Sequence, residues 1–125
     1  MTLHLVSPYV HLRIGWLLVA IVIALSLAPN VPIPQTVPGY SDKVAHVLAY
    51  SGLTMWFAIA ALRHRWQVIS SWFFLLGAVI ETGQAIVPYR MASLEDIIAN
   101  SVGIIFGLLM ATLLIAGSRT LARAK

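Results

Sequence analysis

The chain has 125 residues, of which 60% are hydrophobic and only 10% are charged. A soluble globular domain is typically about half apolar and about a quarter charged, so this composition excludes an ordinary soluble protein. The net charge of +4 does not predict nucleic-acid binding, because the basic residues form no soluble face, and the absence of cysteine excludes disulfides and thiolate metal sites.

Four long apolar segments account for the hydrophobic excess. Each is close to the roughly 20 residues that a transmembrane helix needs, and a backbone in lipid must satisfy its own hydrogen bonds. We therefore expect an all-α membrane protein, a four-transmembrane-helix bundle that forms a single domain over residues 1–125. The expected helices are residues 12–28, 42–62, 67–87 and 94–116.

The connections between these segments differ in character. Residues 29–40 contain four prolines, which favour extended backbone and predict either a lid over the helix ends or a stiff connector. Residues 63–67 and 88–92 are tight turns, which predict that the second, third and fourth helices are antiparallel neighbours. Ser41 and Ser93 are expected to cap the second and fourth helices.

The basic residues predict the orientation of the bundle. With four spans, both termini and the loop around residue 64 lie on one side, and an excess of Lys and Arg marks the cytoplasmic side. The Lys and Arg residues on that side are Arg13, Arg63, Arg65, Arg119, Arg123 and Lys125. Both termini are therefore expected to be cytoplasmic, in a multi-pass protein of the cell membrane. His4, His11 and His64 share that side, and we expect them to be interfacial rather than catalytic.

Polar residues inside the apolar segments gather at the opposite, outer end of the predicted helices. In each helix they recur at steps of three and four residues, so they share one face, and their depths match between helices. Placing such groups against lipid is costly, so a shared pocket near the outer membrane face is expected. The candidate ligand-binding residues are Asp42, Lys43, His46, Tyr50, Glu81, Gln84, Arg90, Ser93, Asp96 and Asn100.

These residues, in this order and together with Pro88 and Gly103, resemble the VanZ-like family of small bacterial integral membrane proteins. The resemblance runs from about Ser41 to Gly107. The family takes its name from a protein linked to resistance to the glycopeptide teicoplanin. The resemblance therefore implies a membrane location and a connection to cell-envelope lipids or glycopeptides, and it supplies no reaction.

Two non-catalytic interpretations of the polar residues stay open. In a binding protein, Lys43 and Arg90 would contact a phosphate or carboxylate at the head-group level, and the other polar residues would hold sugar, peptide or water. In a purely structural network, hydrogen bonds between Asn100 and Gln84, or an ion pair of Arg90 with Asp96, would fix the helix register.

An acid–base enzyme is the third interpretation. His46 or Glu81 would act as the general base with Asp96 as its partner, although no known nucleophile or phosphate-loop motif is present. The same three residues could ligate a divalent cation, but one His and two carboxylates on three helices give a weak signal. We therefore predict no metal and no cofactor.

The expected partners are membrane lipids and a lipid-linked envelope precursor, with no nucleic acid. Gly103 and Gly107 form a G-x-x-x-G step that allows close approach of another helix. Packing within the same bundle is the preferred interpretation of this step, and a homodimer is the alternative.

Overall fold

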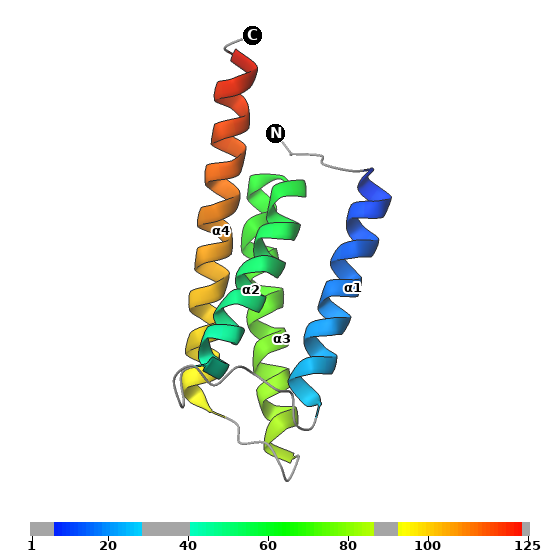
Figure 1. The fold of residues 1–125 in the computed structure, drawn as a ribbon, viewed down its shortest axis with the longest axis vertical. Coiled ribbons are helices and arrows are strands. Elements are labelled where there is room, and N and C mark those ends of the chain that lie inside the picture. The colour runs from blue at the N-terminus through cyan, green and yellow to red at the C-terminus, as the bar shows by residue number, and fades with distance from the viewer. Residues whose placement is uncertain (1–6, 29–40, 87–92, 124–125) are drawn as a thin grey trace.

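The computed structural model describes residues 7–28, 41–86 and 93–123, and nearly all of them are helical. Four α-helices follow one another: α1 (Pro8–Leu27), α2 (Ser41–Ala60), α3 (Trp66–Ile86) and α4 (Leu94–Arg123). A short 3-10 helix, η1 (Arg63–Arg65), precedes α3. The described segments contain no strand, so the expected all-α fold with four helices is confirmed (Figure 1).

The helix ends differ in places from the expected ones. α1 begins at Pro8 rather than at residue 12, because the Ser7 hydroxyl accepts a hydrogen bond from the Val10 N–H at 3.4 Å and proline fits the first helical position. α4 has 30 residues and continues to Arg123, beyond the expected end at residue 116.

The four helices lie side by side and alternate in direction along the chain (Figure 1). α1 and α3 therefore run one way, while α2 and α4 run the other way. The most extensive contact between any two described helices joins α2 to α4, which are parallel. The expected antiparallel pairs of α2 with α3 and of α3 with α4 also form, but they contact each other less.

Two glycines explain why α2 and α4 approach so closely. A Cβ atom added to Gly103 would lie 2.6 Å from the Val47 carbonyl oxygen, and one added to Gly107 would lie 2.6 Å from the Ser51 carbonyl oxygen. The Ser51 hydroxyl also donates to the Gly103 carbonyl at 3.1 Å. Both glycines thus pack within the bundle. The homodimer stays a prediction, and α2 covers the face that it would use.

α1 packs on α2 and α3 along much of its length, with buried residues near its start and in its middle. Near its start, His11 stacks on Trp56 of α2 with ring centroids 4.3 Å apart, and each residue hydrogen-bonds a main-chain oxygen of the other. His11 is only 4% exposed, which corrects the expectation of an interfacial side chain. His64 is exposed, as an interfacial residue would be, and His4 lies outside the described residues.

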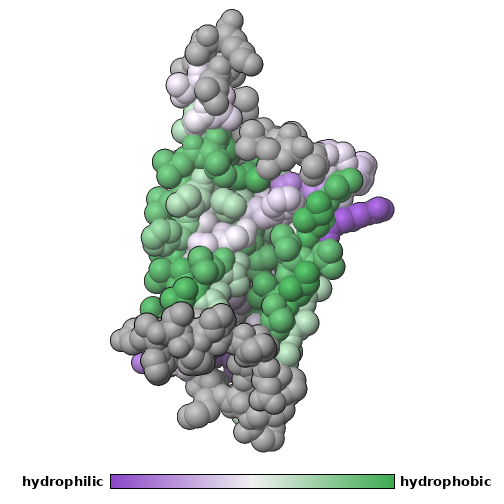
Figure 2. All heavy atoms as spheres, in the orientation of Figure 1, coloured by the Kyte–Doolittle hydropathy of each residue, from purple (hydrophilic) through white to green (hydrophobic). Residues whose placement is uncertain are grey.

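Three helical segments among the described residues are long and apolar enough to cross a membrane: Pro8–Leu27, Arg63–Ile86 and Leu94–Thr120. α2 has 20 residues but carries several polar side chains in its first half, so the prediction of four transmembrane segments is supported for three. Apolar side chains cover much of the face seen in Figure 2, most densely over α1 and α4. Soluble monomers rarely expose apolar patches of this extent.

Candidate functional site

The candidate site lies where α2 and α4 begin and α3 ends, at the bottom of Figure 1. Because α2 and α4 are parallel, the polar residues of their first turns lie near one another. The acidic residues at this end are Asp42, Glu81, Glu95 and Asp96, which are all the acidic residues of the chain. The described basic residues here are Lys43 and His46, so the site has an excess of potential negative charge.

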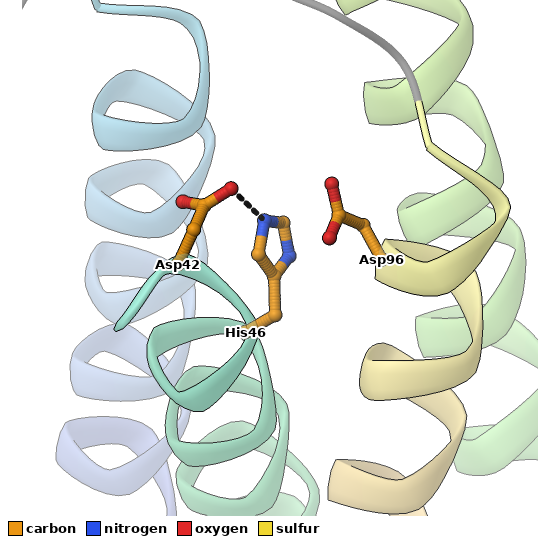
Figure 3. A group of neighbouring side chains, drawn as sticks. All are labelled: Asp42, His46 and Asp96. Atoms are coloured by element: carbon orange, nitrogen blue, oxygen red, sulfur yellow. Dashed lines mark ion pairs between the residues drawn. The ribbon is translucent and has the colours of Figure 1, made fainter. Parts of the chain in front are cut away.

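His46 occupies the centre of the site. Its Nδ1 lies 2.9 Å from Oδ1 of Asn100, and because an amide oxygen can only accept, the imidazole N–H donates this hydrogen bond. Nε2 of the same ring lies 4.0 Å from a carboxylate oxygen of Asp42, one helical turn earlier. Asp96 of α4 faces the ring from the opposite side, so the imidazole lies between two carboxylates (Figure 3).

Asp42, His46 and Asp96 form a compact group of potential metal ligands. One donor atom from each residue lies within 4.8 Å of the other two. Asp96 is 5% exposed, and no hydrogen bond to its carboxylate occurs among the described residues. The Asp42 side chain is 46% exposed, so it connects the group to the surface. Sequence reasoning placed Glu81 in this trio, whereas the structure brings Asp42 there.

Glu81 joins the end of α3 to the start of α4. Its Oε2 accepts a hydrogen bond from the main-chain N–H of Ser93 at 3.1 Å. Ser93 in turn accepts from the Glu95 N–H through its hydroxyl at 3.2 Å, so the expected cap of α4 is present. In a capping box the residue three positions on, here Asp96, would accept the serine N–H. Here the Glu81 carboxylate accepts the Ser93 N–H instead, so the Asp96 carboxylate does not bond it.

Three buried polar atoms in this region have no hydrogen-bond partner among the described residues: Glu81 Oε1, Tyr50 OH and Asn100 Nδ2. Two of them converge on Gly77 of α3, where an added Cβ would lie 2.8 Å from Asn100 Nδ2 and 3.2 Å from Tyr50 OH. A buried polar group without a partner costs about 1–3 kcal/mol. Three such atoms lie in this region of the described structure.

Lys43 and Glu95 form the exposed rim of the site. Lys43 Nζ lies 2.7 Å from Glu95 Oε2, and the two side chains are 32% and 68% exposed. The ion pair links the first turn of α2 to the first turn of α4. The ion pair also occupies Lys43, which the sequence predicts as a phosphate contact.

The structure separates one predicted site residue from the others. Gln84 donates from Nε2 to the Ser26 carbonyl of α1 at 2.7 Å, so it does not bond Asn100 as the structural interpretation supposed. Arg90, the turn at residues 88–92 and the proline-rich residues 29–40 lie outside the described residues. The remaining eight candidates lie at the end of the bundle described above.

Sequence reasoning missed two polar residues that face α4. Thr54 is fully buried, and its hydroxyl has no partner among the described residues. Its position, four residues after Tyr50 on the same helix face, could have revealed it. Ser51 bonds the Gly103 carbonyl, but no sequence signal predicts this, because helical serines often bond the carbonyl of the preceding turn instead.

Comparison with protein families gives one finding. A family model described as VanZ/LLP1 matches residues 11–115, which is most of the chain and includes every residue of the site described above. Comparison with curated proteins and with solved structures gave no match.

Proposed function

Since the chain belongs to the VanZ/LLP1 family, we propose that it is a membrane-embedded binding protein for the head group of an envelope lipid or lipid-linked precursor. Family membership and three helices of spanning length and hydropathy together indicate a membrane protein. The ligand, the envelope location and the orientation in the following paragraphs are parts of this proposal.

In the proposed orientation, the four helices span the cell membrane of a bacterium with both termini in the cytoplasm. The described arginines support this orientation, because Arg13, Arg63, Arg65 and Arg119 belong to the end of the bundle opposite the site. An excess of basic residues marks the cytoplasmic side. The polar site would then face outward, at the depth of the outer-leaflet head groups.

One observation carries the binding proposal: Glu81 Oε1, Tyr50 OH and Asn100 Nδ2 are buried and lack partners among the described residues. A carboxylate accepts, an amide nitrogen donates, and a phenol can do either. Sugar hydroxyls and peptide groups both donate and accept, so they complement this set. Lys43, at the rim, is placed to contact a phosphate if its pairing with Glu95 opens.

The same complementarity extends the proposal to a glycopeptide-related ligand. Glycopeptides carry sugars and peptide groups, which are the chemical groups that the three unpartnered atoms would bind. A role in glycopeptide resistance would follow if the site bound either the antibiotic or the envelope precursor that it targets.

A membrane-embedded acid–base enzyme is the second candidate function, and the setting of His46 favours it. The Asn100 amide fixes the ring and its tautomer, so that Nε2 faces the Asp42 carboxylate rather than the amide. A histidine oriented by a second group is the usual arrangement of a general base. In this candidate, Asp96 or Glu81 would assist His46 in moving a proton on a lipid-linked substrate.

The proposal is tested by purifying the protein in a mild detergent and identifying the bound lipids by mass spectrometry. We expect the wild-type protein to retain a lipid bearing sugar or peptide groups. Glu81→Gln keeps the side-chain shape and an oxygen that can accept from Ser93, but it removes the charge. It should lower the retained lipid about tenfold or more and abolish activity in an envelope-stress assay, with normal membrane insertion.

Glu95→Gln is the matched control, because it removes a carboxylate at the exposed rim and should retain the lipid. Full lipid retention and full activity in both Glu81→Gln and Asp96→Asn would instead support the structural network. Conversion of the lipid by the wild-type protein, lost in His46→Gln while lipid binding persists, would establish the enzyme.

A further inference from the structure

The group formed by Asp42, His46 and Asp96 has the features of a cation site. We propose that these three residues bind a divalent transition-metal cation such as Zn²⁺ at the polar end of the bundle. The proposal concerns the bare protein and is independent of the lipid ligand proposed above.

The first argument is the orientation of the imidazole. His46 donates its Nδ1–H to the Asn100 amide oxygen, which leaves the lone pair of Nε2 directed toward the Asp42 carboxylate. Metal-binding histidines almost always donate the other ring N–H to a carbonyl, carboxylate or water, because this fixes the tautomer and the ring. Asn100, which is 2% exposed, provides that second contact here.

The second argument is the spacing of the donor atoms. Nε2 lies 4.0 Å from the Asp42 oxygen, which is longer than the roughly 2.7–2.9 Å of a charge-assisted hydrogen bond. Three ligands placed about 2.1 Å from a tetrahedral ion would be about 3.4 Å from one another. The three donor atoms lie within 4.8 Å of one another, so small side-chain rotations would bring them close enough to enclose an ion.

The third argument is that Asp96 is buried without a described partner. The residue is 95% buried, because it is 5% exposed, and its side chain points toward the His46 ring (Figure 3). The Ser93 N–H, which a capping box would offer it, is bound by Glu81. Burying a carboxylate is costly, and a metal ion is one of the few groups that can compensate for it.

Charge and ligand type narrow the choice of cation. Two carboxylates, those of Asp42 and Asp96, flank one imidazole (Figure 3). One nitrogen and two oxygen ligands suit Zn²⁺ better than Mg²⁺ or Ca²⁺, which prefer oxygen alone. Three protein ligands would leave one position of a tetrahedral ion open to water or to a ligand.

The test is calorimetric titration of Zn²⁺ into protein that has been purified without a histidine tag and stripped of metal. We expect saturable binding of one ion per chain, and binding weakened at least tenfold by Asp96→Asn and by His46→Gln. Glu95→Gln, which removes the adjacent but exposed carboxylate, should bind Zn²⁺ as the wild-type protein does. Mg²⁺ and Ca²⁺ should not compete at equal concentration.

The absence of saturable Zn²⁺ binding in the wild-type protein would overturn the proposal, as would unchanged affinity in Asp96→Asn. Should the variants fail to fold, the visible spectrum of the Co²⁺-loaded wild-type protein decides. A set of intense ligand-field bands would support a site of low coordination number. The weak spectrum of hexa-aqua Co²⁺ would overturn the proposal. Neither the Zn²⁺ titration nor the Co²⁺ spectrum depends on lipid. The metal proposal can therefore fail while the proposed lipid binding succeeds.

Discussion

The α2–α4 seam and the packing of α1 are two different ways to join helices. In the seam, Gly103 and Gly107 bring main chains into contact, and His46 and Ser51 add hydrogen bonds across it. α1 instead contacts its neighbours mainly through side chains, and an apolar groove of about 430 Å³ lies between it, α2 and α3. The groove is lined in part by Trp16, Val19, Phe73 and Leu76.

This difference shows where the molecule can hold precise polar geometry. Hydrogen bonds and ion ligands need donor atoms fixed to within a fraction of an ångström, and close main-chain contact provides that. The polar site accordingly begins where the seam begins, with His46 and Asn100 on its two sides. Near this end, the Ser26 carbonyl of α1 accepts a hydrogen bond from Gln84 of α3.

The largest expected effect comes from breaking the seam. Gly103→Ala would place a methyl group 2.6 Å from the Val47 carbonyl oxygen, a main-chain atom that cannot rotate away. We expect about 1–3 kcal/mol of destabilisation from this overpacking. Thermal unfolding in detergent would measure it. Gly52→Ala, on α2, the other helix of the seam, has no atom within 4 Å of the added methyl and is the control. Equal melting temperatures for the two variants would show that the seam is not tight.

A smaller effect is expected from loosening α1. His11→Ala removes the stack on Trp56 and one hydrogen bond, while the bond from Trp56 Nε1 to the His11 main-chain oxygen can persist. We expect a loss of about 1–2 kcal/mol. Hydrogen exchange should increase in α1 and stay unchanged in α4. His64→Ala, at an exposed position, should alter neither. Faster exchange throughout α4 would mean that α1 supports the seam.

The smallest effect is expected at the rim of the site. Lys43→Gln breaks the ion pair with Glu95, but both side chains are partly or largely exposed, and such pairs are weak and screened by salt. The melting temperature should not change measurably at physiological salt. A clear drop that disappears at high salt would show that the pair helps to hold α2 against α4.

The sequence was sufficient for the helices and for the end of the bundle at which polar residues meet. Apolar length predicts helices, and three- and four-residue steps predict that Asp96 and Asn100 share a face. The sequence did not predict which residues of different helices contact one another. Tight turns favour contacts between consecutive helices, so the parallel pairing of α2 with α4 was not expected. That pairing places Asp42 rather than Glu81 beside His46 and Asp96.

Gln84 illustrates the same limit. Its spacing from Glu81 predicts a shared face of α3, and both residues are buried. A helix face is wide enough to touch two neighbours, however, and periodicity does not say which one each residue contacts. Gln84 bonds α1 and Glu81 bonds the start of α4.

The parallel seam also has a consequence for biogenesis. The partners of α2 lie more than 50 positions later in the chain: 54 for His46 with Asn100 and 52 for Ser51 with Gly103. A ribosome must therefore finish α3 and much of α4 before the polar side chains of α2 meet their partners. Until then, His46 and Ser51 lack the partners that they have in the folded bundle.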